Sequence, residues 1–321
     1  MVKTLVKENL HPIIGLDITS PDEYIQDNIL EFRKGNILNK NLLERLNTEF
    51  EVIAIYHLAA ILSTRAEYSP KIAHDVNVNG TFNLLQFAME QATSTGKSVK
   101  FFFPSSIAVY GISTLKIKKS SKPVNEDEFR HPETIYGCSK LYCENLGNYY
   151  TNHYKRLSAA SSRGLVDFRS IRFPGLLSAV TTPSGGTSDF APEMIHAAAK
   201  GNSFSCFVRE DTQIPFMTMP DAIRSITTLM AEPSESLSRL TYNVSAFSAS
   251  AGDFRKKLLQ FYPEADITFD IDEPRQDIAD SWPANVDGSA AKQDWNWNPK
   301  HDFDSAFEDY LIPEIQNRYS G

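Results

Sequence analysis

The sequence predicts an α/β fold in which a doubly wound parallel sheet is followed by a smaller C-terminal lobe. Three observations predict it: short apolar stretches typical of buried strands, helical stretches that alternate with them, and a change of pattern after Pro174. Strands that alternate with helices form parallel sheets through right-handed crossovers. The 321 residues suffice for one large α/β domain with a smaller lobe, or for two modest domains. We expect the first domain over residues 1–175 and the smaller lobe over 176–321, with part of the lobe crossing back to the sheet.

Four apolar stretches in the first half have the character of strands. Residues 13–17 end in an acid, and residues 52–58 are nearly all apolar, as in a strand buried on both faces. Residues 100–104 contain three consecutive phenylalanines, and the stretch 168–173 ends before Pro174. We expect these stretches to form the parallel strands.

Helical stretches lie between these strands. Residues 77–90 place Leu84, Leu85 and Ala88 on one face, and residues 134–154 form a longer helical stretch. Residues 4–10 have the character of the end of an earlier helix. Loops are predicted at 158–164, at 183–186 and around the solvated lysines Lys116, Lys118, Lys119 and Lys122.

The composition argues against several classes of partner. The formal net charge of −8 disfavours nucleic acid and anionic membranes. No apolar stretch approaches the ~20 residues of a membrane helix, and the first twelve residues lack the core of a signal peptide. The three cysteines lack metal-ligand spacing and indicate a reducing compartment. We therefore expect no bound metal and a cytoplasmic location, with a mitochondrial one left open.

Tyr136 and Lys140 are four residues apart on a predicted helix, so they share one face. The ordinary pKa of tyrosine is ~10, and a nearby ammonium favours the phenolate. Two charges ~4 Å apart at an effective dielectric of ~20 interact by about 4 kcal/mol, or about 3 pKa units. We therefore expect Lys140 to lower the pKa of Tyr136 towards neutrality, where a general base works best. The alternative interpretation is an exposed helix pair without a function.

Hydroxyl and small side chains follow two of the strands. Ser105 and Ser106 come directly after the three phenylalanines, and ligands of open α/β sheets bind at the carboxyl ends of strands. A hydroxyl there can bond a substrate oxygen, or it can cap a turn. Ala59 and Ala60 follow an earlier strand and let a ligand approach the backbone, or pack in the core. We interpret His57 as a buried, hydrogen-bonded histidine.

Asp17 ends the first strand. In a dinucleotide-binding fold, an acid at this position accepts hydrogen bonds from the adenosine ribose and favours NAD over NADP. The alternative is an ordinary loop acid. Asn36 and Ile37 have the position and character to contact the adenine ring.

Together these segments resemble the extended short-chain dehydrogenase/reductase family, which includes NAD-dependent epimerases and dehydratases. The matching segments are His57–Ala60, Asn77–Thr81, Pro104–Gly111, Tyr136–Lys140 and Arg172–Gly175. The resemblance implies a Rossmann-like fold, NAD as the cofactor, and a catalytic triad of Ser106, Tyr136 and Lys140. Further residues that it places beside the cofactor are Leu58, Ala59, Ala60, Asn77 and Phe173, in addition to Tyr136 and Lys140.

The second half resembles the short-chain form of the L-threonine 3-dehydrogenase family in the segments Gly185–Phe190, Pro215–Ala222 and Ala279–Ala284. That resemblance implies a homodimer and NAD-dependent oxidation of the threonine β-hydroxyl to 2-amino-3-oxobutanoate. A sugar-nucleotide epimerase or dehydratase with the same triad, and a non-catalytic relative, remain as alternatives. The substrate positions implied are Ser63, Ser106, Tyr136, Thr187, Ser188 and Trp282, with Ser188 standing where the family commonly has threonine.

One feature of the family has no counterpart in the sequence. Its glycine-rich turn cradles the pyrophosphate ahead of the Asp17 strand, whereas the earliest glycine here is Gly15, inside that strand. The missing strand would be central, between 13–17 and 52–58, and unpaired buried backbone groups cost roughly 1–3 kcal/mol each. Two interpretations follow. The sequence is N-terminally incomplete, which the intact downstream residues favour, or the chain is a relative that binds the cofactor weakly or not at all.

Overall fold

The computed structural model describes residues 1–8, 11–158, 164–183 and 185–319 of the chain. The chain divides into two compact units. Unit 1 comprises Met1–Ile61, Pro70–Phe103 and Tyr142–Arg169, and unit 2 comprises Leu62–Ser69, Pro104–Leu141 and Ser170–Gly321. Three elements begin in one unit and end in the other, namely β4 (Val99–Ser106), α8 (Ile135–Asn148) and β5 (Val166–Phe173).

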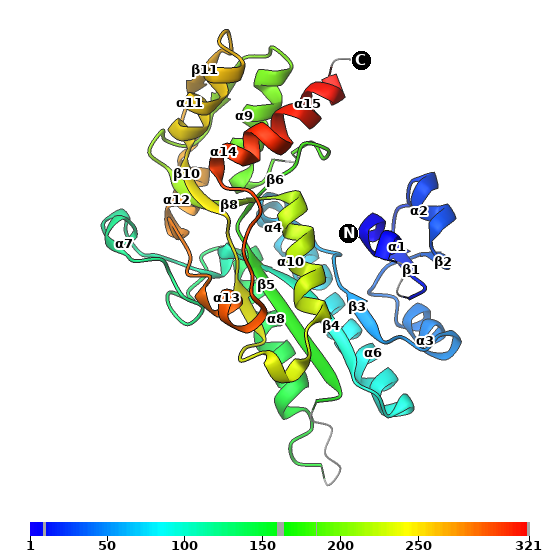
Figure 1. Cartoon of the computed structure of the whole chain (residues 1–321). Coiled ribbons are helices and arrows are strands. Elements are labelled where there is room, and N and C mark those ends of the chain that lie inside the picture. The colour runs from blue at the N-terminus through cyan, green and yellow to red at the C-terminus, as the bar shows by residue number, and fades with distance from the viewer. Residues whose placement is uncertain (9–10, 159–163, 184, 320–321) are drawn as a thin grey trace. The chain divides into compact units, whose positions relative to one another are not determined.

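The remaining helices and strands fall within one unit each. Most of them are labelled in Figure 1. Those of unit 1 are α1 (Val2–Glu8), β1 (Ile14–Asp17), α2 (Glu23–Asn28), β2 (Glu31–Lys34), α3 (Lys40–Glu49), β3 (Ala54–Tyr56), α5 (Pro70–His74) and α6 (Gly80–Thr95). Those of unit 2 are α4 (Ser63–Tyr68), α7 (Leu115–Ser120), β6 (Gly175–Leu177), α9 (Phe190–Ala199), β7 (Phe204–Cys206), β8 (Gln213–Thr218), α10 (Met219–Ala231), β9 (Thr241–Asn243), β10 (Phe247–Ser250), α11 (Ala251–Phe261), β11 (Ile267–Phe269), α12 (Glu273–Ser281), α13 (Ser289–Trp295), α14 (Phe303–Ser305) and α15 (Ile312–Tyr319).

Strands β1 and β2 of unit 1 form a parallel pair of their own, separate from the sheet that contains β3 and β4. The main sheet has the order β3-β4-β5-β9, so that among the described residues no strand pairs with the second edge of β3. The expectation that residues 52–58 form a strand buried on both faces is therefore wrong. The strand is an edge strand of three residues, all half-buried, because only one neighbour shields it.

The core of unit 1 is aromatic. Phe101, Phe102 and Phe103 of β4 are at most 2% exposed, and the Phe168 ring stacks on those of Phe101 and Phe103 with 5.9 Å between the centroids. Helix α6 buries the predicted face, and α3 packs against it (Figure 1). The strands predicted at 13–17, 100–104 and 168–173 and the helices predicted at 77–90 and 134–154 are confirmed.

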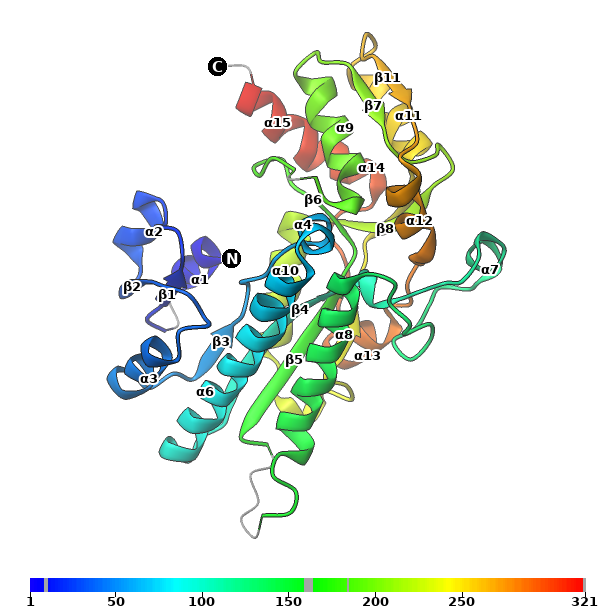
Figure 2. The same cartoon turned by 180° about the vertical axis from the view of Figure 1, so that it is seen from behind.

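Unit 2 adds a three-stranded sheet of order β10-β8-β6 and the parallel pair β11-β7. Helices α9 and α11 pack against each other beside these strands (Figure 2). Between them the ring of Phe216 lies 5.7 Å from that of Phe190 and 4.9 Å from that of Phe254. The parallel sheets with their helices confirm the predicted α/β class.

Two loop predictions had different outcomes. The lysine-rich stretch is not a solvated loop, because residues 115–120 form α7 and the Lys118 side chain is buried. The predicted loops at 158–164 and 183–186 include residues 159–163 and Ser184, which lie outside the described part of the chain. Within the described ranges, no helix combines the length and the apolar character that crossing a membrane requires.

Candidate active site

Ser106 is the last residue of β4 and caps the 3₁₀ turn Ile107–Val109. Its Oγ accepts a hydrogen bond from the backbone N–H of Ala108 at 3.1 Å. The side chain is half-buried. A hydroxyl that accepts one hydrogen bond can still donate its own hydrogen, so capping the turn is compatible with binding a substrate oxygen.

Gly137 allows α8 to approach this turn closely. A Cβ at this position would lie 2.0 Å from the carbonyl oxygen of Ala108 and 2.8 Å from Pro132 Cβ, so only glycine fits. Gly137 directly follows Tyr136, and the backbone N–H of Ala108 donates a hydrogen bond to the Ser106 side chain. The glycine therefore brings the segment of Tyr136 beside the segment of Ser106.

Lys140 lies one helical turn after Tyr136 and is 3% exposed. Its Nζ is 5.4 Å from the centroid of the Tyr136 ring and donates a hydrogen bond of 2.5 Å to the carbonyl oxygen of Pro104. Pro104 is two residues before Ser106. Lys140 thus connects α8 to the end of β4, and the three predicted catalytic residues lie together within unit 2.

Burial raises the pKa of the Tyr136 phenol to about 12. The expectation that Lys140 lowers this pKa towards neutrality is therefore wrong for this structure. The ammonium lies over the ring and bonds the Pro104 carbonyl, so the loss of hydration outweighs its attraction for the phenolate.

The short helix α4 was not predicted, and it links two parts of unit 2. The Oγ1 of Thr64 donates to the carbonyl oxygen of Gly185 at 2.6 Å, and Oε1 of Glu67 accepts from the backbone N–H of Ile135 at 2.8 Å. Helix α4 therefore connects the start of α8 with the loop before α9. The spacing of Thr64 and Glu67 is that of a capping box and could have indicated a helix near this point. In the structure α4 begins one residue earlier, at Ser63, and its N-cap Leu62 makes no side-chain capping bond.

The predicted substrate residues gather around these elements. Ser63 begins α4 and is half-buried. Thr187 is 2% exposed, and the neighbouring Ser188 is half-buried in the same 3₁₀ turn. Helix α12 contacts this turn and ends beside Trp282, which is 4% exposed and belongs to the apolar cluster against which Tyr136 packs. Trp282 therefore has at least a packing role.

The predicted adenosine-side residues lie in unit 1. Asp17 ends β1, is exposed, and accepts from the backbone N–H of Thr19 at 2.8 Å. Asn36 is exposed and its Oδ1 accepts from the backbone N–H of Leu38 at 2.9 Å, while Ile37 is buried against α6. These side chains hold local turns and leave the Asp17 carboxylate accessible.

The segment after β3 is also accessible. Leu58 and Ala59 are exposed and Ala60 is half-buried. The buried Asn77 fixes this segment, because its amide accepts from the backbone N–H of Ile61 at 2.8 Å and donates to the Ile61 carbonyl at 2.9 Å.

Two further predicted residues are buried. His57 contacts Thr81 Oγ1 through Nε2 at 2.9 Å, as expected for a buried, hydrogen-bonded histidine. Phe173, the remaining predicted cofactor residue, ends β5 in unit 2 and is buried.

Comparisons with known proteins agree on the family. A sequence profile of the NAD dependent epimerase/dehydratase family matches residues 1–245. The chain is 35% identical to the mitochondrial L-threonine 3-dehydrogenase of Bos taurus over 297 residues, which are 91% of this chain and 72% of that protein. Its structure is similar to that of a monomeric L-threonine 3-dehydrogenase from a metagenome in the apo form, with a TM-score of 0.85 and 35% identity, covering 99% of this chain and 95% of that one. A UDP-glucose 4-epimerase from Thermotoga maritima has a TM-score of 0.77 at 18% identity, covering 99% and 94% of the two chains, which shows a shared fold alone.

Proposed function

Because the chain belongs to the NAD-dependent epimerase/dehydratase family, we propose that it is a dehydrogenase that oxidises the β-hydroxyl of L-threonine to 2-amino-3-oxobutanoate with NAD. The observation that carries this proposal is the 35% identity to bovine L-threonine 3-dehydrogenase over 91% of the chain. The match includes the second half, where we expect substrate selection, and not only the sheet. The gathering of Ser106, Tyr136 and Lys140 at the end of β4 supports the same reaction.

The three residues have separate roles in this proposal. The hydroxyl of Ser106 donates a hydrogen bond to the substrate hydroxyl oxygen and orients it. The phenolate of Tyr136 accepts the substrate O–H proton, so the substrate alkoxide forms as the phenol O–H bond forms. The ammonium of Lys140, held by Pro104 O, supplies a fixed positive charge one helical turn from Tyr136. A bound NAD would supply the hydride acceptor for oxidation at the threonine β-carbon and the positive charge of its nicotinamide ring.

The pKa of about 12 means that Tyr136 is protonated at neutral pH in the chain alone. Positive charge brought near the phenol favours the phenolate. We therefore propose that Tyr136 becomes a base only when further positive charge is brought near its phenol in the assembled substrate site.

We propose that unit 1 contacts the adenosine end of NAD. The exposed carboxylate of Asp17 suits the ribose hydroxyls, and the exposed Leu58 and Ala59 let a ligand approach the backbone. The described residues include no glycine-rich turn before Asp17 for the pyrophosphate. We expect the ribose and nicotinamide contacts to provide most of the affinity of this chain for NAD.

Absorbance of NADH formed with L-threonine tests the proposed reaction, and NAD-dependent conversion of UDP-glucose tests the epimerase alternative. Calorimetric titration with NAD separates both from a non-catalytic relative, which would show no binding. Turnover of UDP-glucose without turnover of threonine would contradict the proposed substrate.

Tyr136→Phe removes the proposed base and retains the ring. We expect turnover to disappear while the circular dichroism spectrum and the melting temperature stay close to those of the wild type. Tyr24→Phe is the control, because Tyr24 is 44% exposed and lies outside both the candidate active site and the helices α6 and α8. Near-normal activity of Tyr136→Phe would refute the assignment.

We also propose a homodimer that associates through α6 and α8. Both helices carry exposed aromatic side chains, Phe82 on α6 and Tyr142 on α8, and an apolar helical surface of this kind favours association. Light scattering after size-exclusion chromatography measures the mass. A monomer at micromolar concentration would contradict the dimer and match the metagenome relative, which is described as monomeric.

A further inference from the structure

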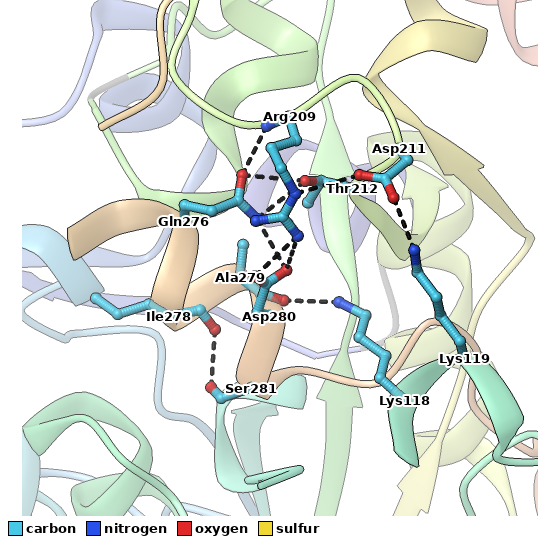
Figure 3. Close-up of polar contacts among 10 residues, drawn as sticks. All are labelled: Lys118, Lys119, Arg209, Asp211, Thr212, Gln276, Ile278, Ala279, Asp280 and Ser281. Atoms are coloured by element: carbon cyan, nitrogen blue, oxygen red, sulfur yellow. Dashed lines mark hydrogen bonds and ion pairs between the residues drawn. The ribbon is translucent and has the colours of Figure 1, made fainter. Parts of the chain in front are cut away.

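Unit 2 contains a hollow that none of the candidate active-site residues lines. Its volume is ≈ 410 Å³, which suits a small metabolite. Its lining residues come from α7 and the segment after it, from the loop that joins β7 to β8, and from the end of α12. Figure 3 draws several of them, including Lys118, Arg209 and Asp280. Its charged lining residues are Lys118, Lys119, Lys122, Arg209, Asp211 and Asp280.

Both acidic side chains of the lining are paired with cations. Lys119 Nζ lies 2.8 Å from Asp211 Oδ2, and Arg209 Nη2 donates to both carboxylate oxygens of Asp280 at 2.9 Å (Figure 3). Gln276 also donates to Asp280 at 2.8 Å. These contacts neutralise the two carboxylates and leave the charges of two further lysines in excess, although the whole chain has a formal net charge of −8.

Lys118 is one of these two lysines, and its side chain is 5% exposed. Its ammonium has three N–H donors. Within the described residues, the carbonyl oxygen of Ala279 at 2.8 Å is the acceptor that it reaches (Figure 3). A buried cation without a carboxylate partner costs free energy. Consistently, burial lowers the pKa of Lys118 to about 8, and the charged groups that influence it are Asp280, Arg209 and Asp211.

A purely structural role accounts for only part of this arrangement. Ala279 is in the last turn of α12, and a cation near a helix C-terminus is stabilising. That role uses one N–H of Lys118. It does not require that Lys118 line a hollow, or that the exposed Lys122 line the same hollow.

We propose that this hollow binds a small organic dianion, either a phosphate monoester or a dicarboxylate, with the Lys118 ammonium as its main anchor. Lys122 at the rim supplies the second positive charge. The apolar side chains of Ile112 and Val124, which also line the hollow, contact the carbon skeleton of the ligand. This site is additional to the proposed dehydrogenase site and does not depend on it.

Calorimetric titration of the full chain tests the site with glycerol 3-phosphate, succinate and uncharged glycerol. We expect saturable binding of one dianion at one site per chain and no binding of glycerol. The dianion that binds more tightly identifies the class of ligand. Binding of neither dianion would overturn the proposal.

Lys118→Met should weaken binding of that dianion at least tenfold. Lys116→Met is the matched control, because Lys116 is exposed on the same helix and does not line the hollow. Unchanged affinity in Lys118→Met would show that the ligand binds elsewhere and would overturn the assignment.

Acetylation of lysines in the wild-type chain, followed by mass spectrometry, gives a second measurement that needs no variant and no turnover. We expect the saturating dianion to slow acetylation of Lys118 several-fold and to leave Lys116 unaffected. Equal acetylation of Lys118 with and without the ligand would contradict the proposal, whether or not the chain oxidises threonine.

Discussion

Replacing Gly137 by alanine tests whether the close approach of α8 to the turn after β4 positions the candidate site. The added Cβ would lie 2.0 Å from the Ala108 carbonyl oxygen, whereas real Cβ contacts essentially never fall below 3.0 Å. The two backbones must therefore separate by about 1 Å (3.0 − 2.0). Both atoms in conflict are fixed by backbone geometry, so no side-chain rotation relieves the overlap.

We expect Gly137→Ala to lower the free energy of unfolding, although alanine has the higher helix propensity. Alanine is favoured over glycine within a helix by roughly 0.5–1 kcal/mol, whereas overpacking costs about 1–3 kcal/mol. We expect the free energy of unfolding to fall by about 1–2 kcal/mol. Since a displacement of about 1 Å at a reacting group can lower a rate ~100-fold, we expect kcat for threonine oxidation to fall by about that factor.

Chemical denaturation measures the first quantity and NADH formation the second. Gly288→Ala is the matched control, because the nearest atom to its new Cβ is Asn243 O at 3.7 Å, an ordinary contact. Because Gly288 is the N-cap of α13 and alanine caps a helix less well than glycine, that variant should lose no more than about 1 kcal/mol and should keep the wild-type kcat. Wild-type stability together with wild-type kcat in Gly137→Ala would refute the reasoning. The stability measurement stands even if threonine proves not to be the substrate.

Three further predictions address the ligand sites. Ser106→Ala should lower kcat/KM for threonine about 10²–10³-fold, as expected for loss of a hydrogen-bond donor to a reacting oxygen, and an unchanged value in steady-state assays would remove Ser106 from the mechanism. Asp17→Ala should weaken NAD binding about tenfold or more, because a hydrogen bond to a charged group contributes about 1.5–3 kcal/mol, and calorimetry showing equal Kd values would argue against a ribose contact. Burial holds the folded-state pKa of Lys118 at about 8 against an ordinary 10.5, so the unfolded chain binds the proton more tightly. The wild type should therefore lose roughly 3 kcal/mol of stability relative to Lys118→Met as the pH falls from 10.5 to 8, and parallel pH profiles of the two free energies of unfolding would contradict this.

Local patterns in the sequence predicted the elements at the centre of the sheet. Three consecutive phenylalanines identify β4, and the spacing of Leu84, Leu85 and Ala88 identifies the buried face of α6. These features depend on residues close together in the chain. The same holds for the shared helical face of Tyr136 and Lys140.

Features that depend on distant residues could not be predicted in this way. The burial of Lys118 is linked to Ala279, 161 positions away in the chain, and a lysine-rich stretch alone indicates a solvated surface. The pKa of Tyr136 depends on where the Lys140 ammonium points and how much water remains around the phenol. Neither follows from a four-residue spacing.

Among the described residues before Ile37, none is buried, and this has a consequence for how the chain binds ligands. Strands β1 and β2 shield little apolar surface, so their amide hydrogens should exchange with solvent at a lower opening free energy than those of β4 and β5. A ligand that contacts Asp17 selects the ordered form of this segment, and its apparent Kd equals the intrinsic Kd divided by the ordered fraction. Part of the binding free energy of the nucleotide would then be used to order the very strands that receive it.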